Sequence, residues 1–455
     1  MTDAAAPPDP AAVLRQRSYR GLLVLAAITG VVVSLASWGF LELVHALQDW
    51  AFKDLPGELG FSGIPTWWPL PLLALAGPVI AFAILRLPGR GGHEPVEGLK
   101  SGPPTTPIQL PGVMLAAFAT LGLGLVLGPE APLIALGSGL GILAVKLARR
   151  DAPDQALAVM AAAGSFAAIS TIFGSPIVGA LIIIEAAGLG GPMLPVVLLP
   201  GLIAAGIGSL VFIGMGSLTG LSSSAYAIAP LTLASYPRPT LAAFGWTLVI
   251  AVAAALVTFA TILLGRVTQR LVHRRTYLMV TVAALLIGVC AIAFFEITGE
   301  PANLVLFSGQ DGMGAVVQQA ATLSLGTLAL LIVFKSLAWG LSLGAARGGP
   351  TFPAIFLGIV GGLLAAHLPG FSETPAIAVL VAAMCVSMLR LPLSSIVIAL
   401  IVTRAGLGST PLIIVGTAVA YLVTVGLAAR REAAEGAPAS AGAGPAATGA
   451  TPSPS

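Results

Sequence analysis

The chain has 455 residues, of which 57% are hydrophobic and 9% are charged, and its formal net charge is +3. Soluble proteins carry about 25% charged residues, and the mean hydropathy here is +1.00. This composition excludes an ordinary soluble protein. The basic residues are few and clustered, which argues against nucleic-acid binding. We therefore expect an all-α integral membrane protein.

The two ends of the chain differ in composition from its apolar middle part. Residues 1–20 lack the pattern of a secretory signal, and we interpret them as a short cytoplasmic tail. Residues 431–455 consist largely of Ala, Gly, Pro, Ser and Thr, a composition that cannot bury a core and predicts disorder. This C-terminal stretch is too short for a folded cytoplasmic domain. The membrane domain is accordingly expected to occupy residues 21–430.

Apolar runs follow one another through this middle part, and several exceed the roughly 20 residues that span a bilayer. The run at 111–147 is long enough for two segments that join inside the membrane. In chain order, the runs lie near 21–47, 68–87, 111–147, 156–187, 193–219, 240–272, 278–297, 320–345, 351–368, 374–403 and 411–429.

Basic residues gather between these runs. Because cytoplasmic loops are enriched in Lys and Arg, the clusters predict a multi-pass protein of the cell membrane, surrounded by lipids, with both termini in the cytoplasm. The clusters are Arg15/Arg17/Arg20, Lys146/Arg149/Arg150, Arg266/Arg270/Arg274/Arg275 and Arg430/Arg431.

Prolines interrupt many of the apolar runs. A proline inside a helix removes a hydrogen bond and clashes with the preceding turn. In a membrane, such breaks are tolerated only where protein or a water-filled cavity covers them, and paired breaks indicate discontinuous helices around a central site. The interrupting prolines include Pro129, Pro132, Pro176, Pro195, Pro200, Pro350, Pro353 and Pro392.

Two of the broken segments resemble each other. GPEAPLIALG begins at Gly128 and GPTFPAIFLG begins at Gly349, and both fit G-P-x-x-P-x-x-x-L-G. A second pair follows in the same order, GSPIVGALIIIE from Gly174 and RLPLSSIVIALI from Arg390. These two pairs of similar segments predict two related halves, near 21–220 and 240–430. An odd number of spans per half would make the repeats inverted, and an even number would make them parallel.

Each GPxxP element is interpreted as the start of a helix inside the membrane, since proline is favoured in the first helical turn. The first N–H groups of a helix are unpaired, and that end of its dipole is positive. Two such ends aimed at one point would bind an anion without a basic side chain.

Glu130 is the third residue of the first motif. Its carboxylate would lie beside the helix start as a tethered anion that competes for the site and leaves when protonated. Glu130 is therefore a candidate gate and proton carrier. The alternative is a structural carboxylate that caps a helix, although a charge at the bilayer centre costs about 2.5–3.5 kcal/mol on insertion scales.

These motifs resemble those of the CLC family of chloride channels and proton/chloride exchangers. LGPEAP resembles the family's G-[KR]-E-G-P with Glu130 as the gating glutamate, and GGPTFP (348–353) resembles its G-x-F-x-P. GSPIVGALIIIE is similar to a family helix whose recurrent acid matches Glu185, and GGHEPVEG (91–98) resembles G-S-G-I-P-x-x-x-G.

The resemblance implies a CLC-like fold of tilted and broken helices, a homodimer with one anion pathway per subunit, and no cofactor or metal. It also implies a set of anion-binding residues around the gate. These are Gly92, His93, Gly128, Pro129, Ala131, Gly349, Thr351 and Phe352.

The sequence departs from the family pattern at several places. Pro129 replaces the basic residue beside the gate, and His93 lies about where the family has an anion-coordinating serine. Ala186 occupies the place of the inner proton-transfer glutamate of many exchangers. No residue matches the tyrosine that closes the inner side of the site in many members, because Tyr421 comes too early.

Several other polar residues invite structural interpretations. Glu185 is expected to pair inside the protein, while Lys335 and Arg347 could supply positive potential near the pathway or pair with Glu185 or Glu296. His93 could coordinate an anion, carry protons or face solvent in its loop. The remaining histidines, His45, His273 and His367, are expected to lie near the interface, and Cys290 and Cys385 to be small core residues.

The sequence thus supports a CLC-type antiporter that exchanges a small monovalent anion, most simply chloride, for protons. One alternative is a passive anion channel, which Ala186 and the missing tyrosine favour. Another is a carrier for a different anion such as fluoride, nitrate or an organic anion. An enzyme is not expected, because the chain shows no nucleophile–base pair and no metal cluster.

Overall fold

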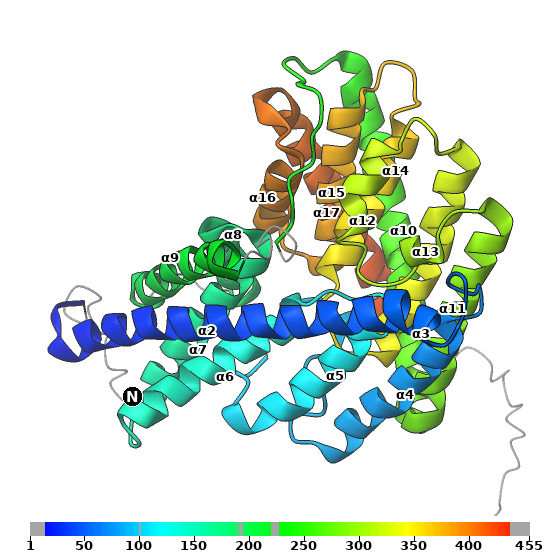
Figure 1. Ribbon diagram of the computed structural model, residues 1–455. Coiled ribbons are helices and arrows are strands. Elements are labelled where there is room, and N and C mark those ends of the chain that lie inside the picture. Colours follow the sequence, from blue (N-terminus) through cyan, green and yellow to red (C-terminus); the bar gives the residue numbers. More distant parts are fainter. Residues whose placement is uncertain (1–13, 100–101, 189, 191–193, 220–226, 437–455) are drawn as a thin grey trace, which may run out of the picture.

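The structure is a computed structural model that describes residues 14–99, 102–188, 190, 194–219 and 227–436 (Figure 1). Its first helices are α2 (Arg17–Asp49), α3 (Leu55–Glu58), α4 (Pro69–Arg86), α5 (Leu110–Gly122), α6 (Glu130–Ala148), α7 (Asp154–Phe173), α8 (Pro176–Ala186) and α9 (Leu194–Thr219). The later helices are α10 (Leu241–Arg274), α11 (Thr276–Thr298), α12 (Gly312–Gln318), α13 (Leu325–Ala345), α14 (Thr351–Ala365), α15 (Glu373–Leu389), α16 (Pro392–Thr403) and α17 (Gly406–Gly436).

The predicted all-α membrane fold is confirmed. Within the described ranges, the regular secondary structure is helical apart from one isolated bridge between Gly128 and Gly349. Nine of the helices in these ranges are long and apolar enough to cross a membrane. Shorter apolar helices, including α5, α8, α14 and α16, lie between them. The protein is therefore a multi-pass membrane protein built from both full and partial spans.

The helical region reaches further than the apolar runs. Helix α2 begins at Arg17, inside the predicted tail 1–20, and α17 continues to Gly436, beyond the boundary predicted at 430. Arg, Ala and Glu favour helix and continue it past the apolar segment at both ends, and the domain boundaries at 20 and 430 stay predictions. The predicted disorder of the C-terminal tail otherwise falls on residues outside the described part of the chain.

The long apolar runs are broken where glycine and proline predict it. The run 111–147 forms α5 and α6, with an irregular connection at 123–129. Helix α7 ends at Gly174, which adopts the left-handed conformation favoured by glycine, and Pro176 opens α8. The Ser175 side chain accepts a hydrogen bond from the Val178 N–H and so caps α8.

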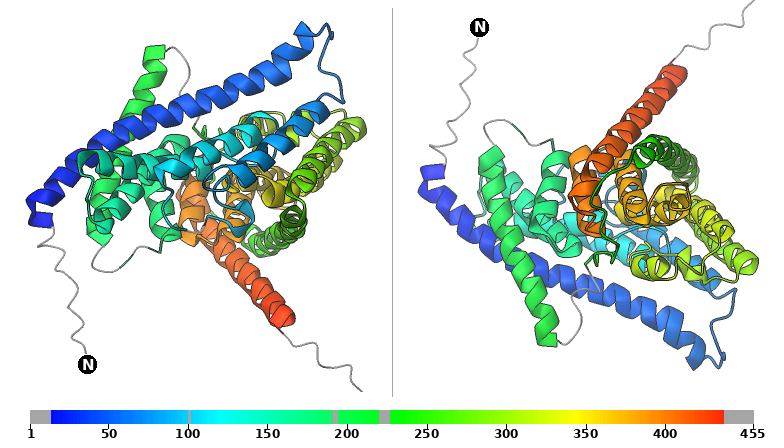
Figure 2. Two further views of the ribbon diagram at one scale, coloured as in Figure 1. Left: turned by 90° about the horizontal axis from the view of Figure 1, so that it is seen from below. Right: turned by 90° about the horizontal axis from the view of Figure 1, so that it is seen from above.

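The helices pack in the same order in the two predicted halves. Helices α6 and α7 pack together as α14 and α15 do, and α7 packs on α9 as α15 packs on α17. Helix α2 packs on α7 and α9, and α10 packs correspondingly on α15 and α17. Figure 2 shows α2 along one side of the molecule and the end of α17 projecting from it. Because the helices pack in a matching order, the predicted division into two related halves is supported.

The halves meet through corresponding elements. Helix α4 packs on α11, α8 packs on α16, and the starts of α6 and α14 are joined by the Gly128–Gly349 bridge. Seven helices of each half follow this correspondence, from α2 and α10 to α9 and α17, with α3 and α12 outside it. Since they include both full and partial spans, the inverted arrangement of the repeats stays a prediction.

Candidate functional site

The two GPxxP motifs meet back to back. The Gly128 N–H donates to the Gly349 carbonyl and the Gly349 N–H donates to the Gly128 carbonyl, each over 2.7 Å. Helix α6 begins at Glu130 and α14 begins at Thr351, which is the third position of each motif. The two helix starts are thereby fixed beside each other by their own backbone.

The proline spacing limits which N–H groups are free at each helix start. Proline has no N–H, so the second and fifth motif positions donate nothing. The next N–H on α6, that of Leu133, donates to the Pro129 carbonyl over 3.0 Å. Helix geometry therefore leaves two donors per motif without an acceptor in their own helix. They are the N–H groups of Glu130 and Ala131 on α6 and of Thr351 and Phe352 on α14.

The Glu130 side chain lies in this junction and is fully buried. Its Oε1 accepts a hydrogen bond from the Thr351 N–H at the start of the other helix. The Thr351 side chain and the Phe352 N–H also face this carboxylate. A carboxylate thus occupies the electropositive junction, held by groups at the start of the other helix.

The motif glycines make space for the carboxylate. A Cβ atom at Gly349 would overlap the Glu130 carboxyl carbon, and a Cβ at Gly128 would overlap Oε2. Any larger residue at either position would push the carboxylate out of the junction. The glycines serve the side-chain position as well as the chain break.

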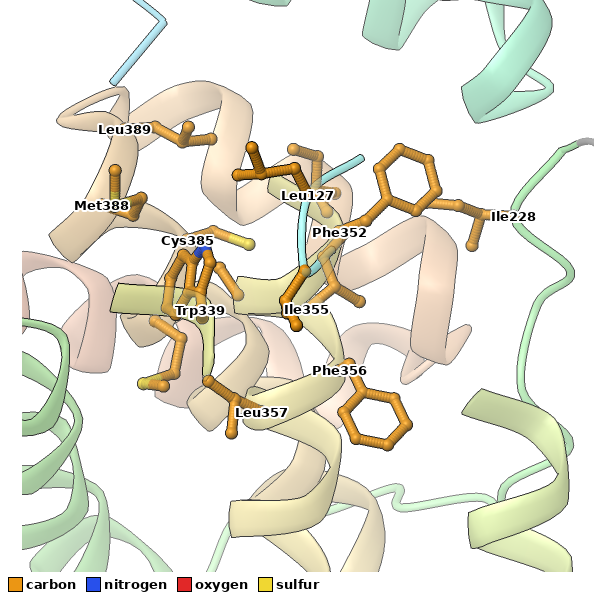
Figure 3. Close-up of a cluster of buried hydrophobic side chains, with 14 of the residues drawn as sticks. Leu127, Ile228, Trp339, Phe352, Ile355, Phe356, Leu357, Cys385, Met388 and Leu389 are labelled. Carbon is orange, nitrogen blue, oxygen red and sulfur yellow. The ribbon is translucent and has the colours of Figure 1, made fainter. Parts of the chain in front are cut away.

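Buried apolar side chains surround the junction. Figure 3 shows Leu127, Phe352 and Ile355 packed near Trp339 and Cys385, all of them fully buried. The Phe352 ring also lies 5.8 Å, centroid to centroid, from that of Phe173. Charge and dipole interactions are stronger in such an apolar setting than in water.

The predicted glycine loop 91–98 lies beside Arg347, directly before the second motif. Its His93 Nε2 donates to the Gly98 carbonyl over 2.8 Å, which closes the loop on itself. In the described part of the chain, neither Gly92 nor His93 makes a hydrogen bond to Glu130. Gly91, Gly92 and Gly98 have positive φ angles, which glycine adopts readily. The anion-binding role of Gly92 and His93 stays a prediction.

Arg347 ties this loop to the second motif. Its guanidinium lies 3.3 Å from Glu94 Oε1 and donates to the carbonyls of Arg90 and Ala346. His273 Nε2 lies 3.1 Å from the same Glu94 oxygen, and Gln269 donates to the other one. Burial favours a raised pKa for Glu94, but the charge of Arg347 and these hydrogen bonds outweigh it and lower the pKa.

Lys335 is fully buried in α13 and makes contacts that the sequence did not indicate. Its Nζ donates to the carbonyls of Leu306 and Phe307 over 2.8 and 3.0 Å, and lies 4.7 Å from the centroid of the Phe356 ring. Of the alternatives that the sequence left open for Lys335 and Arg347, the structure does not show the pairing with Glu185 or Glu296. Lys335 donates to these two carbonyls instead, and Arg347 pairs with Glu94 and donates to the carbonyls of Arg90 and Ala346.

Glu185 pairs inside the protein, as predicted. Its carboxylate accepts hydrogen bonds from the N–H groups of Leu393 and Ser394 over 2.9 and 2.7 Å, and from the Ser394 hydroxyl over 2.7 Å. Because these donors lie in the first turn of α16, an acid at the end of α8 caps the corresponding helix of the other half.

A cavity of about 320 Å³ reaches the junction from the end of α2. Its lining includes Pro129, directly before the gate candidate, and Phe356 on α14. His45 also lines it, with Nε2 3.9 Å from Asp311, so this histidine faces the cavity as well as the surface. No sequence signal could have revealed this cavity, because its walls come from four segments that are distant in the sequence.

Neither the cysteines nor the possible metal ligands form a disulfide or a metal site in the described part of the chain. Cys385 is buried and Cys290 is half-buried, and both are free thiols, as the prediction of core residues required. Within the described ranges, no group of three or more His, Cys, Asp or Glu side chains could hold a metal ion.

The sequence profile of the family described as "Voltage gated chloride channel" matches residues 88–425, which include both motifs and the junction. The chain belongs to this family. The predicted family resemblance is thereby confirmed. Members of the family are transporters, so the expectation of a transporter rather than an enzyme is confirmed as well.

Curated relatives carry a transport name. The chain is 32% identical over 362 residues to "Putative ion-transport protein YfeO" of Salmonella paratyphi A, covering 77% of this chain and 81% of the relative. It is 29% identical over 362 residues to the protein of that name from Escherichia coli O139:H28, covering 78% and 81%.

Solved structures share the fold. A slow cyanobacterial Cl⁻/H⁺ antiporter superposes with a TM-score of 0.69 at 18% identity, over 89% of this chain and 94% of that one. A CLC-type fluoride/proton antiporter superposes with a TM-score of 0.66 at 18% identity, over 89% and 95%. At this identity the likeness establishes the CLC fold, as the sequence predicted.

Proposed function

We propose that this protein is a proton-linked antiporter of small monovalent anions, with chloride as the first candidate and Glu130 as the gate. The observation that carries the proposal is the position of the Glu130 carboxylate. It lies between Gly128 and Gly349, where the starts of α6 and α14 meet, and it accepts the Thr351 N–H.

The proposed gate works by competition. A free anion and the carboxylate seek the same helix-start donors, and two negative charges repel each other in an apolar site. Anion entry therefore displaces the ionised Glu130 side chain, and protonation removes its charge and its advantage as a ligand. The N–H groups of Ala131 and Phe352 are then the donors that hold the anion, with Gly128, Pro129, Gly349 and Thr351 forming the walls.

The reliance on backbone donors suits rapid transport. A fixed cation at the site would hold an anion tightly, whereas conduction requires binding weak enough for release. The two nearby buried cations are already engaged, Lys335 by two carbonyls and Arg347 by Glu94. They supply background positive potential rather than direct ligands.

Fluoride is the second candidate substrate. The buried Thr351 side chain lies at the start of α14 beside the Glu130 carboxylate, and once that carboxylate leaves, a small anion with strong hydrogen-bond acceptance would suit the hydroxyl donor. One structural neighbour is a fluoride/proton antiporter. A passive anion channel is the further alternative, since Ala186 provides no acid beside Glu185 at the end of α8.

Flux measurements on purified protein in liposomes test this proposal. An imposed chloride gradient should drive uphill proton movement, followed with an external pH electrode, and the same vesicles should be tested with fluoride. The Glu130→Gln variant should conduct the anion without proton movement and without response to pH. Anion flux of the native protein without proton movement would exclude exchange, and an unchanged pH response of the variant would exclude Glu130 as the gate.

The assembly and orientation also belong to the proposal. We infer a homodimer in the cell membrane, with one anion pathway in each subunit and both termini in the cytoplasm. Crosslinking in native membranes tests the dimer, and labelling of single cysteines introduced near residues 15 and 431 tests the orientation.

A further inference from the structure

A second cavity, separate from the gate, is lined by four arginines from three parts of the chain. Its volume is about 350 Å³, within the range of small-molecule sites. Its lining includes the side chains of Arg266, Arg270, Arg390 and Arg431, with Glu97 as the one acid. The cavity therefore concentrates positive charge far beyond what the chain carries on average, since Lys and Arg together number 21 in 455 residues.

The helix dipole explains why single arginines lie near helix ends, but it does not explain why four of them line one cavity. Arg270 lies near the end of α10 and Arg431 near the end of α17, where a cation offsets the negative helix dipole. That effect does not require the guanidinium groups to face a common space. Arg266 and Arg270 are four residues apart on one helix, a spacing at which like charges repel.

The cavity is built by packed elements rather than by loose surface side chains. Helix α10 contributes Ile262, Arg266, Gln269 and Arg270, whose spacing places them on one helix face. Helices α10, α15 and α17 pack against one another. The opposite wall is the 3₁₀ turn Pro95–Glu97, held against α15 where Gly98 approaches the Met388 carbonyl.

The chemistry of the lining selects for phosphate. Guanidinium groups present five N–H donors in a planar fork that matches phosphate oxygens, so arginines with partners inside the protein can still contact a ligand. Chloride offers no such geometry, and the cavity is large for a single monatomic ion. Arg270 and Arg390 are exposed, while Arg266 and Arg431 are half-buried, so a ligand can enter from solvent.

We propose that this cavity binds a phosphate-bearing ligand, with Arg266, Arg270, Arg390 and Arg431 as its ligands. A soluble phosphate compound and the headgroup of an anionic phospholipid share this chemistry. The site stands apart from the junction at Glu130 and does not depend on which ion the protein transports.

The test uses the full-length protein in a neutral detergent, with melting followed by tryptophan fluorescence. Inorganic pyrophosphate is titrated in one arm, and sodium gluconate of equal ionic strength serves as the control. A second arm adds micelles containing phosphatidylglycerol, with phosphatidylcholine as the control. A saturable rise of Tm with pyrophosphate supports a soluble ligand, and a rise only with phosphatidylglycerol supports a lipid headgroup.

Variants locate the effect. Arg270→Gln removes one fork, and Arg390→Asn removes another while tolerating the left-handed backbone at this position. Each should raise the half-saturating concentration about tenfold, whereas Arg150→Gln, on the exposed α6–α7 connection, should leave it unchanged. Absence of a specific rise in both arms with the native protein overturns the proposal. So does an equal response of the native protein and both cavity variants.

Discussion

The two halves of the molecule share their backbone plan and divide the buried charges between them. Counted from the first glycine of each GPxxP motif, Glu130 corresponds to Thr351, Lys335 to Met114 and Arg347 to Val126. Glu185, counted along the second pair of similar segments, corresponds to Ile401. The acids thus lie in the first half and the cations in the second.

This division shows what the repeat provides and what it does not. The matched backbone supplies two helix starts and two sets of free N–H groups, which would serve any anion equally. The unmatched side chains make the junction asymmetric, because one half contributes a competing carboxylate and the other a hydroxyl. Gating requires that asymmetry, since a site built from two identical motifs would have no internal competitor or two that repel each other.

Gly349→Ala tests whether the glycine of the second motif makes room for the Glu130 carboxylate at the junction. The added Cβ overlaps the Glu130 carboxyl group, so the carboxylate should leave the site, and anion flux at neutral pH should rise several-fold with a weakened pH response. Liposome flux measured across pH checks this. The control is Gly245→Ala, at an exposed position on α10 with open space for a Cβ. A variant with native flux and native pH response would contradict the proposed cradle.

Lys335→Met makes the second half like the first, where Met114 takes the corresponding place. The change leaves the carbonyls of Leu306 and Phe307 without their donor, and the protein should lose about 1–3 kcal/mol of stability. Thermal unfolding in detergent measures the loss. Lys146→Met at an exposed position on α6 is the matched control. Equal stability of the two variants would show that the ammonium group is not needed for this loop.

Glu185→Ala removes the acid that caps the corresponding helix of the other half. The first turn of α16 loses its acceptor for two N–H groups, and we expect a loss of about 0.5–2 kcal/mol. Glu185→Gln should lose less because one amide oxygen still accepts. Glu296→Ala, at an exposed site on α11, provides the control. Unfolding curves of Glu185→Ala that match this control would rule out the cap.

Glu94→Gln tests the smallest effect, the link between the glycine loop and the second motif. Arg347 and the hydrogen bonds of Glu94 lower its pKa in the folded protein. The ionised pair therefore stabilises the fold above the ordinary carboxyl pKa, and the contribution disappears as pH falls through the lowered folded value. Because Glu94 is partly exposed, the contribution should stay below about 1 kcal/mol.

The measurement for this link is Tm as a function of pH. Native protein and Glu94→Gln should differ at pH 7 and converge as the pH falls below 4. A constant difference across this range would mean that the charge of Glu94 is not what stabilises the contact.

The sequence predicted the parts of the site that rest on local rules. Proline and glycine set where α6 and α14 begin. Glu130 lies between two prolines in an apolar run, which indicates that its carboxylate has an unusual place in the membrane. The recurrence of the motif indicated that both helix starts serve one purpose. These features depend on neighbours within a few residues, which is why they can be predicted from the sequence alone.

The remaining features join residues that are far apart in the sequence. The Gly128–Gly349 bridge, the Lys335 contacts and the Arg347–Glu94 pair each depend on tertiary packing. The sequence offered Glu185 and Glu296 only as one open alternative for the two cations. Backbone carbonyls, which carry no sequence signal, instead satisfied Lys335. The basic cavity was visible in the sequence only as scattered arginines.

The most direct test of the account is to locate the anion with and without the competing carboxylate. Crystals of the native protein and of Glu130→Gln, soaked in bromide, would give anomalous scattering from any bound ion. Competition at the junction predicts a bromide peak in the variant, between the N–H groups of Ala131 and Phe352, at the place the carboxylate takes in the native junction. A variant whose junction holds no bromide, with the ion bound elsewhere along the chain, would contradict it.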